Sequence, residues 1–120
     1  MENGFSFELY ETIFKNCFVN SSRYSNGDLQ LELFGVDPTT NETEHFADIT
    51  LEQNVRSLRD DEIVVDCRFK PTLIPQLIDL GIIKDQTGVC VVDNNIYPIY
   101  TVNLIKVQEN SYCMHELIAA

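Results

Sequence analysis

The sequence predicts an α+β fold in a single domain, residues 1–120, with a mainly antiparallel β-sheet of about five to seven strands. One short central helix is expected at about residues 72–80, and short helices can form at the termini. Three observations lead to this prediction. An Asn-Gly turn precedes a run of alternating leucines. Consecutive β-branched residues occupy positions 63–65, and an amphipathic helical stretch stops at Gly81.

The first 15 residues carry two competing periodicities. One set recurs at helical spacing, namely Tyr10, Ile13, Phe14, Cys17 and Phe18. Another set alternates as in a strand, namely Phe5, Phe7 and Leu9. We favour a short N-terminal helix or an irregular arm that covers one end of the sheet. The aromatic side chains are expected in the core, although a docking segment would have the same composition.

In the next elements apolar and polar residues alternate, as in an antiparallel sheet with one solvent-exposed face. Residues 17–24 predict a strand, and the Asn-Gly turn joins it to a second strand over 29–33. A loop follows at 37–41, and a third strand is expected at 46–51. The inward-facing set of this third strand is Phe46, Ile49 and Leu51. This set breaks strict alternation, which indicates a β-bulge.

A polar connection, Gln53–Asp61, precedes the strand at positions 63–65. Val55 and Leu58 are its expected apolar anchors. Its two arginines are expected to form ion pairs with the neighbouring acids.

The helix prediction depends on two prolines. Pro71 biases the preceding residue away from helical geometry, and Thr72 is a good N-cap, so the helix should begin at Leu73. Pro75 then lies in the first turn, where its missing N–H is not needed. Gly81 is the expected left-handed stop. The apolar face of the helix comprises Leu73, Ile74, Leu77 and Ile78.

The C-terminal third predicts two further strands. Val89–Val92 has the composition of a buried strand, and a turn at Asp93–Asn95 joins it to a strand over Ile96–Val107. Pro98 cannot donate to a ladder, so we place it at an edge or a bulge. A last short helix is expected at Tyr112–Ile118.

The order of these elements carries a resemblance. Between Phe18 and Leu104 there follow the hairpin SNGDLQLELF, the strands HFADITLE and DEIVVD, the helix end LIDLGII, a TG turn and YPIYTVNL. In this order the chain resembles the small bacterial proteins called domain of unknown function 4313. Lys70-Pro71-Thr72 departs from the more acidic helix entry expected of that family. The resemblance implies a link with plasmids and conjugative elements, and it implies no catalytic residue.

The chain is strongly acidic, with 8 Lys and Arg against 19 Asp and Glu and a net charge of −11. This charge argues against binding to nucleic-acid phosphates or to anionic membranes. It is compatible with a basic partner, although many ordinary cytosolic proteins are equally acidic without one. No apolar run approaches the ~18 residues of a membrane span, and no signal peptide is evident, so we expect a cytoplasmic protein. In that compartment the four cysteines are expected to be free thiols, Cys17, Cys67, Cys90 and Cys113.

The sequence offers no recognisable catalytic motif. His45 and His115 lie beside no nucleophile signature, and the spacing of Cys113 and His115 is not that of a zinc half-site. We therefore predict a non-enzymatic accessory protein without cofactor or metal. The resemblance implies that it is bacterial and associated with mobile elements or phages, and its charge favours a protein partner that has a basic surface.

The predicted partner-binding residues are acidic: Asp48, Glu52, Asp60, Asp61, Glu62 and Asp66. A sharper hypothesis is an inhibitor whose carboxylates imitate phosphates in the groove of a nucleic-acid-handling or defence protein. That hypothesis requires a continuous line of acids on one face, drawn from Asp28, Glu32, Glu42, Glu44, Asp48, Glu52, Asp60, Asp61 and Glu62. The alternative is a small-ligand or cation-binding module, which would need a concave pocket with convergent polar groups.

Overall fold

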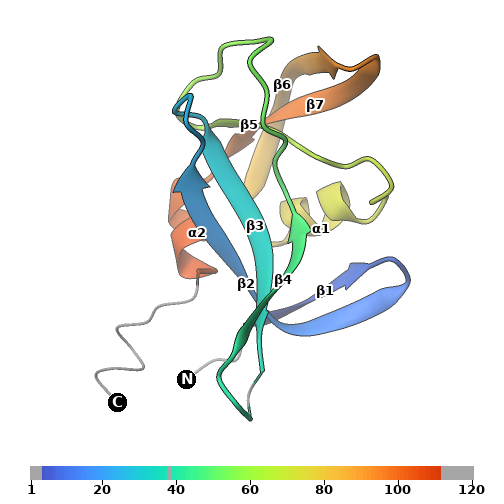
Figure 1. Cartoon of the computed structure of the whole chain (residues 1–120), viewed down its shortest axis with the longest axis vertical. Coiled ribbons are helices and arrows are strands. Elements are labelled where there is room, and N and C mark those ends of the chain that lie inside the picture. The colour runs from blue at the N-terminus through green and yellow to red at the C-terminus, as the bar shows by residue number, and fades with distance from the viewer. Residues whose placement is uncertain (1–3, 38, 112–120) are drawn as a thin grey trace.

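The computed structural model describes residues 4–37 and 39–111, which form two antiparallel sheets and two short helices (Figure 1). The first sheet has the order β1-β2-β3-β4, with bounds Phe5–Leu9, Thr12–Arg23, Leu29–Val36 and Thr43–Asp48. The second has the order β5-β7-β6, with bounds Glu62–Val64, Asn95–Val102 and Ile83–Val92. The helices are α1, Leu73–Asp79, and α2, Leu104–Glu109. The predicted α+β class is confirmed, but the strands are divided between two sheets.

The main core lies between the inner faces of the sheets and α1. Leu31 and Leu33 of β3 meet Ile63 of β5 and Leu73 and Leu77 of α1, and all five side chains are fully buried. The predicted alternation of β3 is confirmed, because each leucine is buried while the residues between them are half-buried. This burial, rather than helix propensity, stabilises the seven-residue α1.

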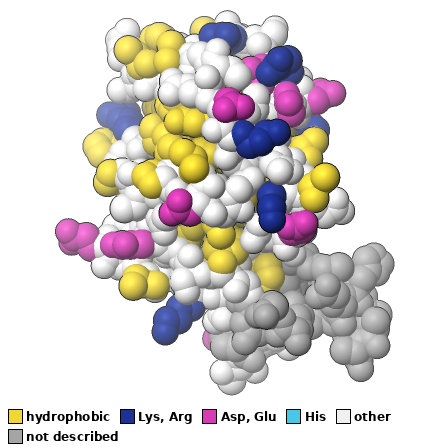
Figure 2. Space-filling view, turned by 180° about the vertical axis from the view of Figure 1, so that it is seen from behind, with side chains coloured by type: hydrophobic (Ala, Val, Ile, Leu, Met, Phe, Trp, Pro, Cys, Tyr) yellow, Lys and Arg dark blue, Asp and Glu magenta, His cyan; other side chains and the backbone are white. Residues whose placement is uncertain are grey.

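A smaller apolar cluster lies on the other face of the second sheet. It contains Val64, Cys90, Tyr97 and Ile99. Leu58 packs against this cluster, as predicted, whereas Val55 is 68% exposed and is not an anchor. Seen from behind, the molecule shows exposed hydrophobic side chains, and its lysines and arginines are interspersed with carboxylates (Figure 2).

The N-terminal segment forms a β-hairpin, so the predicted helix or irregular arm is wrong. β1 pairs with β2, and Leu9 lies opposite Thr12. The two turn residues, Tyr10 and Glu11, have φ angles of 54° and 62°, as in a type I′ turn. Because Asn and Gly usually form this turn, no local residue signal marks it here. Phe7 is buried as the alternation indicated, whereas Tyr10 is exposed.

β3 and β4 pair through a β-bulge. Leu33 lies opposite Ala47 and Phe34 lies opposite His45, so Phe46 is the extra residue. The bulge predicted from the broken alternation is therefore present, although β4 begins and ends earlier in the chain than predicted.

Helix α1 begins at Leu73, as predicted, and Gly81 follows it with a φ of 76°. Ile78 is 46% exposed, so the apolar face is narrower than predicted. Thr72 occupies the N-cap position but makes no side-chain capping bond. Its hydroxyl donates instead to the carbonyl oxygen of Glu8, at 2.6 Å, and so ties the helix to β1.

The β6–β7 hairpin turns at Asp93 and Asn94, which both have positive φ, as the predicted turn requires. β6 is the outer strand of its sheet. Val89 and Val91 are about half exposed instead of buried as predicted, whereas Cys90 between them points to the other face and is buried.

Pro98 lies in the middle strand, β7, rather than at the predicted edge or bulge. The Pro98 carbonyl oxygen accepts a hydrogen bond from the backbone amide of Val65, the residue just after β5. Because β5 ends there, the missing N–H of Pro98 does not break the β5–β7 ladder.

Helix α2 replaces the end of the strand predicted over Ile96–Val107. The Asn103 side chain accepts hydrogen bonds from two backbone amides of the first turn, at 3.1 and 3.2 Å, and thereby caps the helix. The last predicted helix, Tyr112–Ile118, lies outside the described residues, and so do Cys113 and His115.

Arg56 covers the outer edge of β6. Its Nη1 donates to the carbonyl oxygen of Val89 at 2.9 Å. The guanidinium also lies against Gly88, where an added Cβ would be 3.0 Å from Nη1. Instead of the predicted pairing with nearby acids, this arginine occupies a strand edge.

Candidate cation-binding site

The six acids predicted to bind a partner do not gather in one place, and Glu62 serves the fold. It is buried, and its carboxylate oxygens accept from the Arg59 amide at 2.9 Å and from the Thr87 hydroxyl at 2.7 Å. The bond from the Arg59 amide, and then the bond from Thr87, hold the pKa of the Glu62 carboxyl below its ordinary value. These bonds connect the 52–61 segment to the second sheet.

Asp66 also has an internal partner. The ammonium of Lys70, which is buried, donates to the Asp66 carboxylate at 3.2 Å and to the Asp66 carbonyl oxygen at 3.1 Å. The same ammonium donates to the backbone carbonyl oxygen of Asp48 at 3.0 Å. Lys70 therefore links the end of β4 to the segment before α1.

Asp60 and Asp61 lie together at the turn before β5. The Nε of Arg59 is 3.6 Å from Asp61 Oδ1 and 3.6 Å from Glu62 Oε1, as the predicted local pairing requires. The pair with Asp61 is exposed on both sides and contributes little to stability, whereas the Glu62 side of the second pair is buried.

Asp48 belongs to a carboxylate–imidazole cluster with Glu32 and His45 on the outer face of β3 and β4. His45 Nε2 lies 3.0 Å from Asp48 Oδ1 and 3.3 Å from Glu32 Oε2. Each of the three residues offers one ligand atom, and these atoms all lie within 4.8 Å of one another. His45 and Asp48 are exposed and Glu32 is half-buried, so the cluster is open to solvent.

The bulge at Phe46 creates this cluster. Residues three apart in a regular strand point to opposite faces of the sheet. The extra residue between His45 and Asp48 turns both toward the outer face. Glu32 lies directly opposite Asp48 in the ladder and completes the cluster from β3.

Two neighbours support the cluster. The amide of Asn20 on β2 donates to Glu32 Oε1 at 3.4 Å, which leaves Oε2 toward the imidazole. The ring of Phe34 meets the imidazole of His45 edge to face, with centroids 5.2 Å apart.

Glu52 lies in the same neighbourhood, beside Tyr24. Burial raises the pKa of the Tyr24 hydroxyl, and its hydrogen bond with Thr50, at 2.9 Å, lowers it. The negative charges of Asp48, Glu52 and Glu32 raise that pKa further. Three carboxylates therefore act on one half-buried hydroxyl at the edge of the outer face.

The sequence pointed to Asp48 and Glu52, and to Glu32 in the wider line of acids, but it did not connect them with His45. The spacing of His45 and Asp48 is uninformative unless the bulge is placed between them. The broken alternation predicted a bulge in this strand without fixing its position. A bulge placed at Phe46 would have indicated the cluster.

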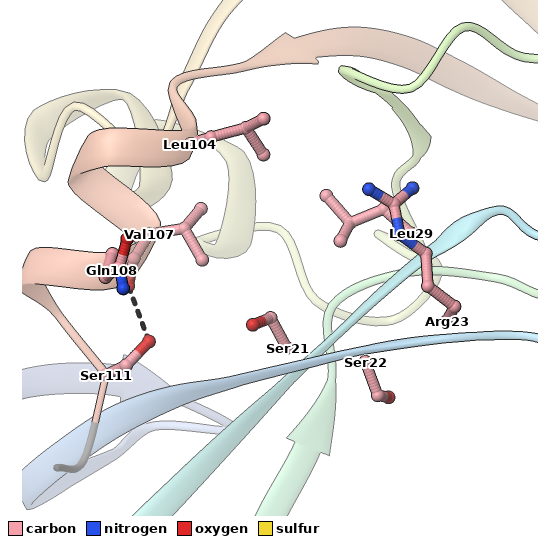
Figure 3. A pocket seen from close by; sticks show the side chains of 8 residues that line it. All are labelled: Ser21, Ser22, Arg23, Leu29, Leu104, Val107, Gln108 and Ser111. Carbon is pink, nitrogen blue, oxygen red and sulfur yellow. Dashed lines mark hydrogen bonds between the residues drawn. The ribbon is translucent and has the colours of Figure 1, made fainter.

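A separate hollow lies between the C-terminal half of β2 and α2 (Figure 3). It has a volume of about 420 Å³. Its lining residues are Ser21, Ser22, Arg23, Leu29, Leu104, Val107, Gln108 and Ser111. Among the described residues that line it, Arg23 is the one titratable side chain.

The described cysteines are free thiols, as predicted. Burial raises the pKa of Cys17 to about 11 and also raises the pKa of Cys67 and Cys90. At neutral pH these three thiols are protonated and poorly nucleophilic. Neither described helix has the length and apolar character that crossing a membrane requires.

Comparison with models of known families, with curated proteins and with solved structures found no match. The resemblance to domain of unknown function 4313 stays a prediction.

Proposed function

We propose that the protein is a non-enzymatic binding protein that receives a basic segment of a protein partner on the outer face of β2, β3 and β4. One observation carries this proposal. The side chains that the β2–β3 and β3–β4 ladders turn to the outer face include the carboxylates Glu32 and Asp48 but no lysine or arginine. Beyond the aromatic rings, these side chains are Asn20, Ser22, Gln30, Glu32, Val36, Thr43, His45 and Asp48. Glu52 adds a third carboxylate, whose negative charge acts on Tyr24 together with those of Asp48 and Glu32.

This outer face differs from the side seen in Figure 2, where cations lie between the acids. Lys15 of β2 lies beside Val36 and Thr43 at the far end of the outer face. A lysine or arginine that approaches Glu32 and Asp48 would meet negative charge, and the outward-facing residues of the β2–β3 and β3–β4 ladders include no competing cation. Complementary charge of this kind speeds association and selects partners more than it raises affinity.

The phosphate-imitating inhibitor needs a longer line of acids than this face offers. Glu44 pairs with Gly35, on the side of the sheet that carries the buried leucines, and Glu62 is buried. An inhibitor of a nucleic-acid-handling or defence protein would therefore depend on the carboxylates of Glu32, Asp48 and Glu52.

A comparison of two triple variants tests the docking proposal. Glu32→Gln/Asp48→Asn/Glu52→Gln neutralises the outer face, while Asp79→Asn/Asp85→Asn/Asp93→Asn neutralises three exposed acids elsewhere. The probe is a fluorescent lysine- and arginine-rich peptide, and anisotropy is measured at low and high salt without metal. The outer-face variant should bind the peptide more weakly than the control, although both have the same net charge. Equal losses would show that only net charge matters, and the proposal would be wrong.

A further inference from the structure

We propose that Glu32, His45 and Asp48 bind one divalent transition-metal ion of the class of Zn²⁺ or Co²⁺. The protein would supply one imidazole nitrogen and two carboxylate oxygens, and water would fill the remaining positions. This site does not depend on the docking of a basic partner.

Two of the three separations between the donor atoms fit a shared ion, and the third, between the carboxylate oxygens of Asp48 and Glu32, is at most 4.8 Å. Metal–ligand bonds of about 2.0–2.2 Å place neighbouring donors about 2.8–3.6 Å apart in octahedral or tetrahedral geometry. His45 Nε2 is 3.0 Å from Asp48 Oδ1 and 3.3 Å from Glu32 Oε2. A protonated imidazole between two carboxylates would have the same separations, so the test has to distinguish a metal from a proton.

The three donors are carried by paired strands rather than by loops. The ladder fixes Glu32 opposite Asp48, and the bulge turns His45 to their side. The Asn20 amide holds one oxygen of Glu32, and the Phe34 ring flanks the imidazole. Donors that are already in place lose less conformational entropy when an ion binds.

The donor set selects the class of metal. Imidazole nitrogen suits Zn²⁺, Co²⁺, Ni²⁺ and Cu²⁺, whereas Mg²⁺ and Ca²⁺ prefer oxygen ligands alone. The side chains that the β2–β3 and β3–β4 ladders turn to the outer face include no lysine or arginine that could neutralise the two carboxylates.

The experiment is calorimetric titration of the full chain with Zn²⁺ and, separately, with Mg²⁺. All proteins carry Cys113→Ser and His115→Asn, so that the Cys/His pair outside the described residues does not contribute. We expect one Zn²⁺ per chain and much weaker binding of Mg²⁺. Replacing a direct ligand by His45→Asn or Asp48→Asn should weaken Zn²⁺ binding by at least about tenfold. Losing a residue that only hydrogen-bonds a metal ligand already weakens binding on that scale.

Glu44→Gln is the matched control, because it removes a carboxylate next to His45 in β4 but on the other face. Its Zn²⁺ affinity should stay close to that of the parent protein. The ¹⁵N resonance of His45 Nε2 should also shift on addition of Zn²⁺ at constant pH, which a proton does not explain.

Three results would overturn the site. They are no Zn²⁺ binding by the parent at millimolar concentration, equal binding in all variants, or a loss with Asp48→Asn that His45→Asn does not share. The last result would indicate diffuse attraction by carboxylates. Because the peptide measurement contains no metal, failure of the metal site and failure of the docking surface are distinguishable.

Discussion

The ring of Phe46 lies over Gly35 on the neighbouring strand, in the space that any side chain at position 35 would occupy. Phe46 is the bulged residue, and its ring also packs on Phe14 of β2, with centroids 4.5 Å apart. The absence of a side chain at Gly35 therefore lets the bulge place its ring against the sheet. The same bulge puts His45 and Asp48 on one face.

Gly35→Ala should destabilise the protein by about 1–3 kcal/mol, because the new methyl group overpacks the site. The midpoint of urea unfolding measures this change. The ring must move to accept the methyl group, so the affinity of the cluster for Zn²⁺ should also fall.

The double variant Gly35→Ala/Phe46→Ala supplies the control. If the collision with the ring is the cause, the methyl group should be much less harmful once the ring is gone, and the two changes should not be additive. Additive losses of stability would contradict this account.

Gln76 of α1 pairs with the backbone of Glu8 as a neighbouring strand would. The Glu8 amide donates to Gln76 Oε1 at 2.7 Å, and Gln76 Nε2 donates to the Glu8 carbonyl oxygen at 2.7 Å. Gln76→Ala removes both bonds and should lower the free energy of unfolding by about 1–2 kcal/mol. Hydrogen exchange at the Glu8 amide should become faster.

Gln76→Glu separates the two bonds, because a carboxylate still accepts from the Glu8 amide but cannot donate to its carbonyl oxygen. Protection of the amide should then be largely retained. Unchanged exchange in Gln76→Ala would show that the two Gln76 bonds do not hold β1 in place.

Glu62 gives the fold a dependence on pH. Its pKa is lower in the folded protein than in the unfolded chain, so its stabilisation is fully present above the unfolded value. That contribution is lost as the pH falls through the lower folded pKa. Glu62→Gln should therefore cost about 1–3 kcal/mol at neutral pH, and the difference from the wild type should shrink in acid.

Urea unfolding of both proteins, followed from pH 7 to about pH 3, measures this difference. Asp60→Asn, at an exposed neighbour, is the control and should show no such trend. A constant difference between Glu62→Gln and the wild type across this range would contradict the assignment.

Elements with strong local signals could be predicted from the sequence. Alternating leucines fixed the buried face of β3, and the prolines and Gly81 fixed both ends of α1. The N-terminal hairpin was missed because Tyr10 and Glu11 adopt positive φ without the residues that usually mark it. Tertiary packing decides such turns, and no local pattern records it.

The site was harder to predict than the fold, for a physical reason. Charge and composition indicated acids at the surface, but their grouping depends on strand register. Glu62 and Asp66 look as free in the sequence as Asp48 does, yet the first two are held by internal partners. A single extra residue in β4 determines whether His45 faces the carboxylates, and the position of that residue is set by the packing of Phe46.

We expect Arg56 to limit the self-association of the molecule at high concentration. β6 is an outer strand with half-exposed valines, and an unprotected strand of this kind is a template for pairing with another chain. By donating to the Val89 carbonyl oxygen, the guanidinium occupies part of that template. Arg56→Ala should make the average mass in sedimentation rise with concentration more steeply than Arg23→Ala, which removes the same charge elsewhere. Equal behaviour of the two variants would contradict this role. If Arg56 has this role, resistance of the three-stranded sheet to edge-to-edge pairing between molecules depends on one side chain. That side chain comes from a segment without regular secondary structure.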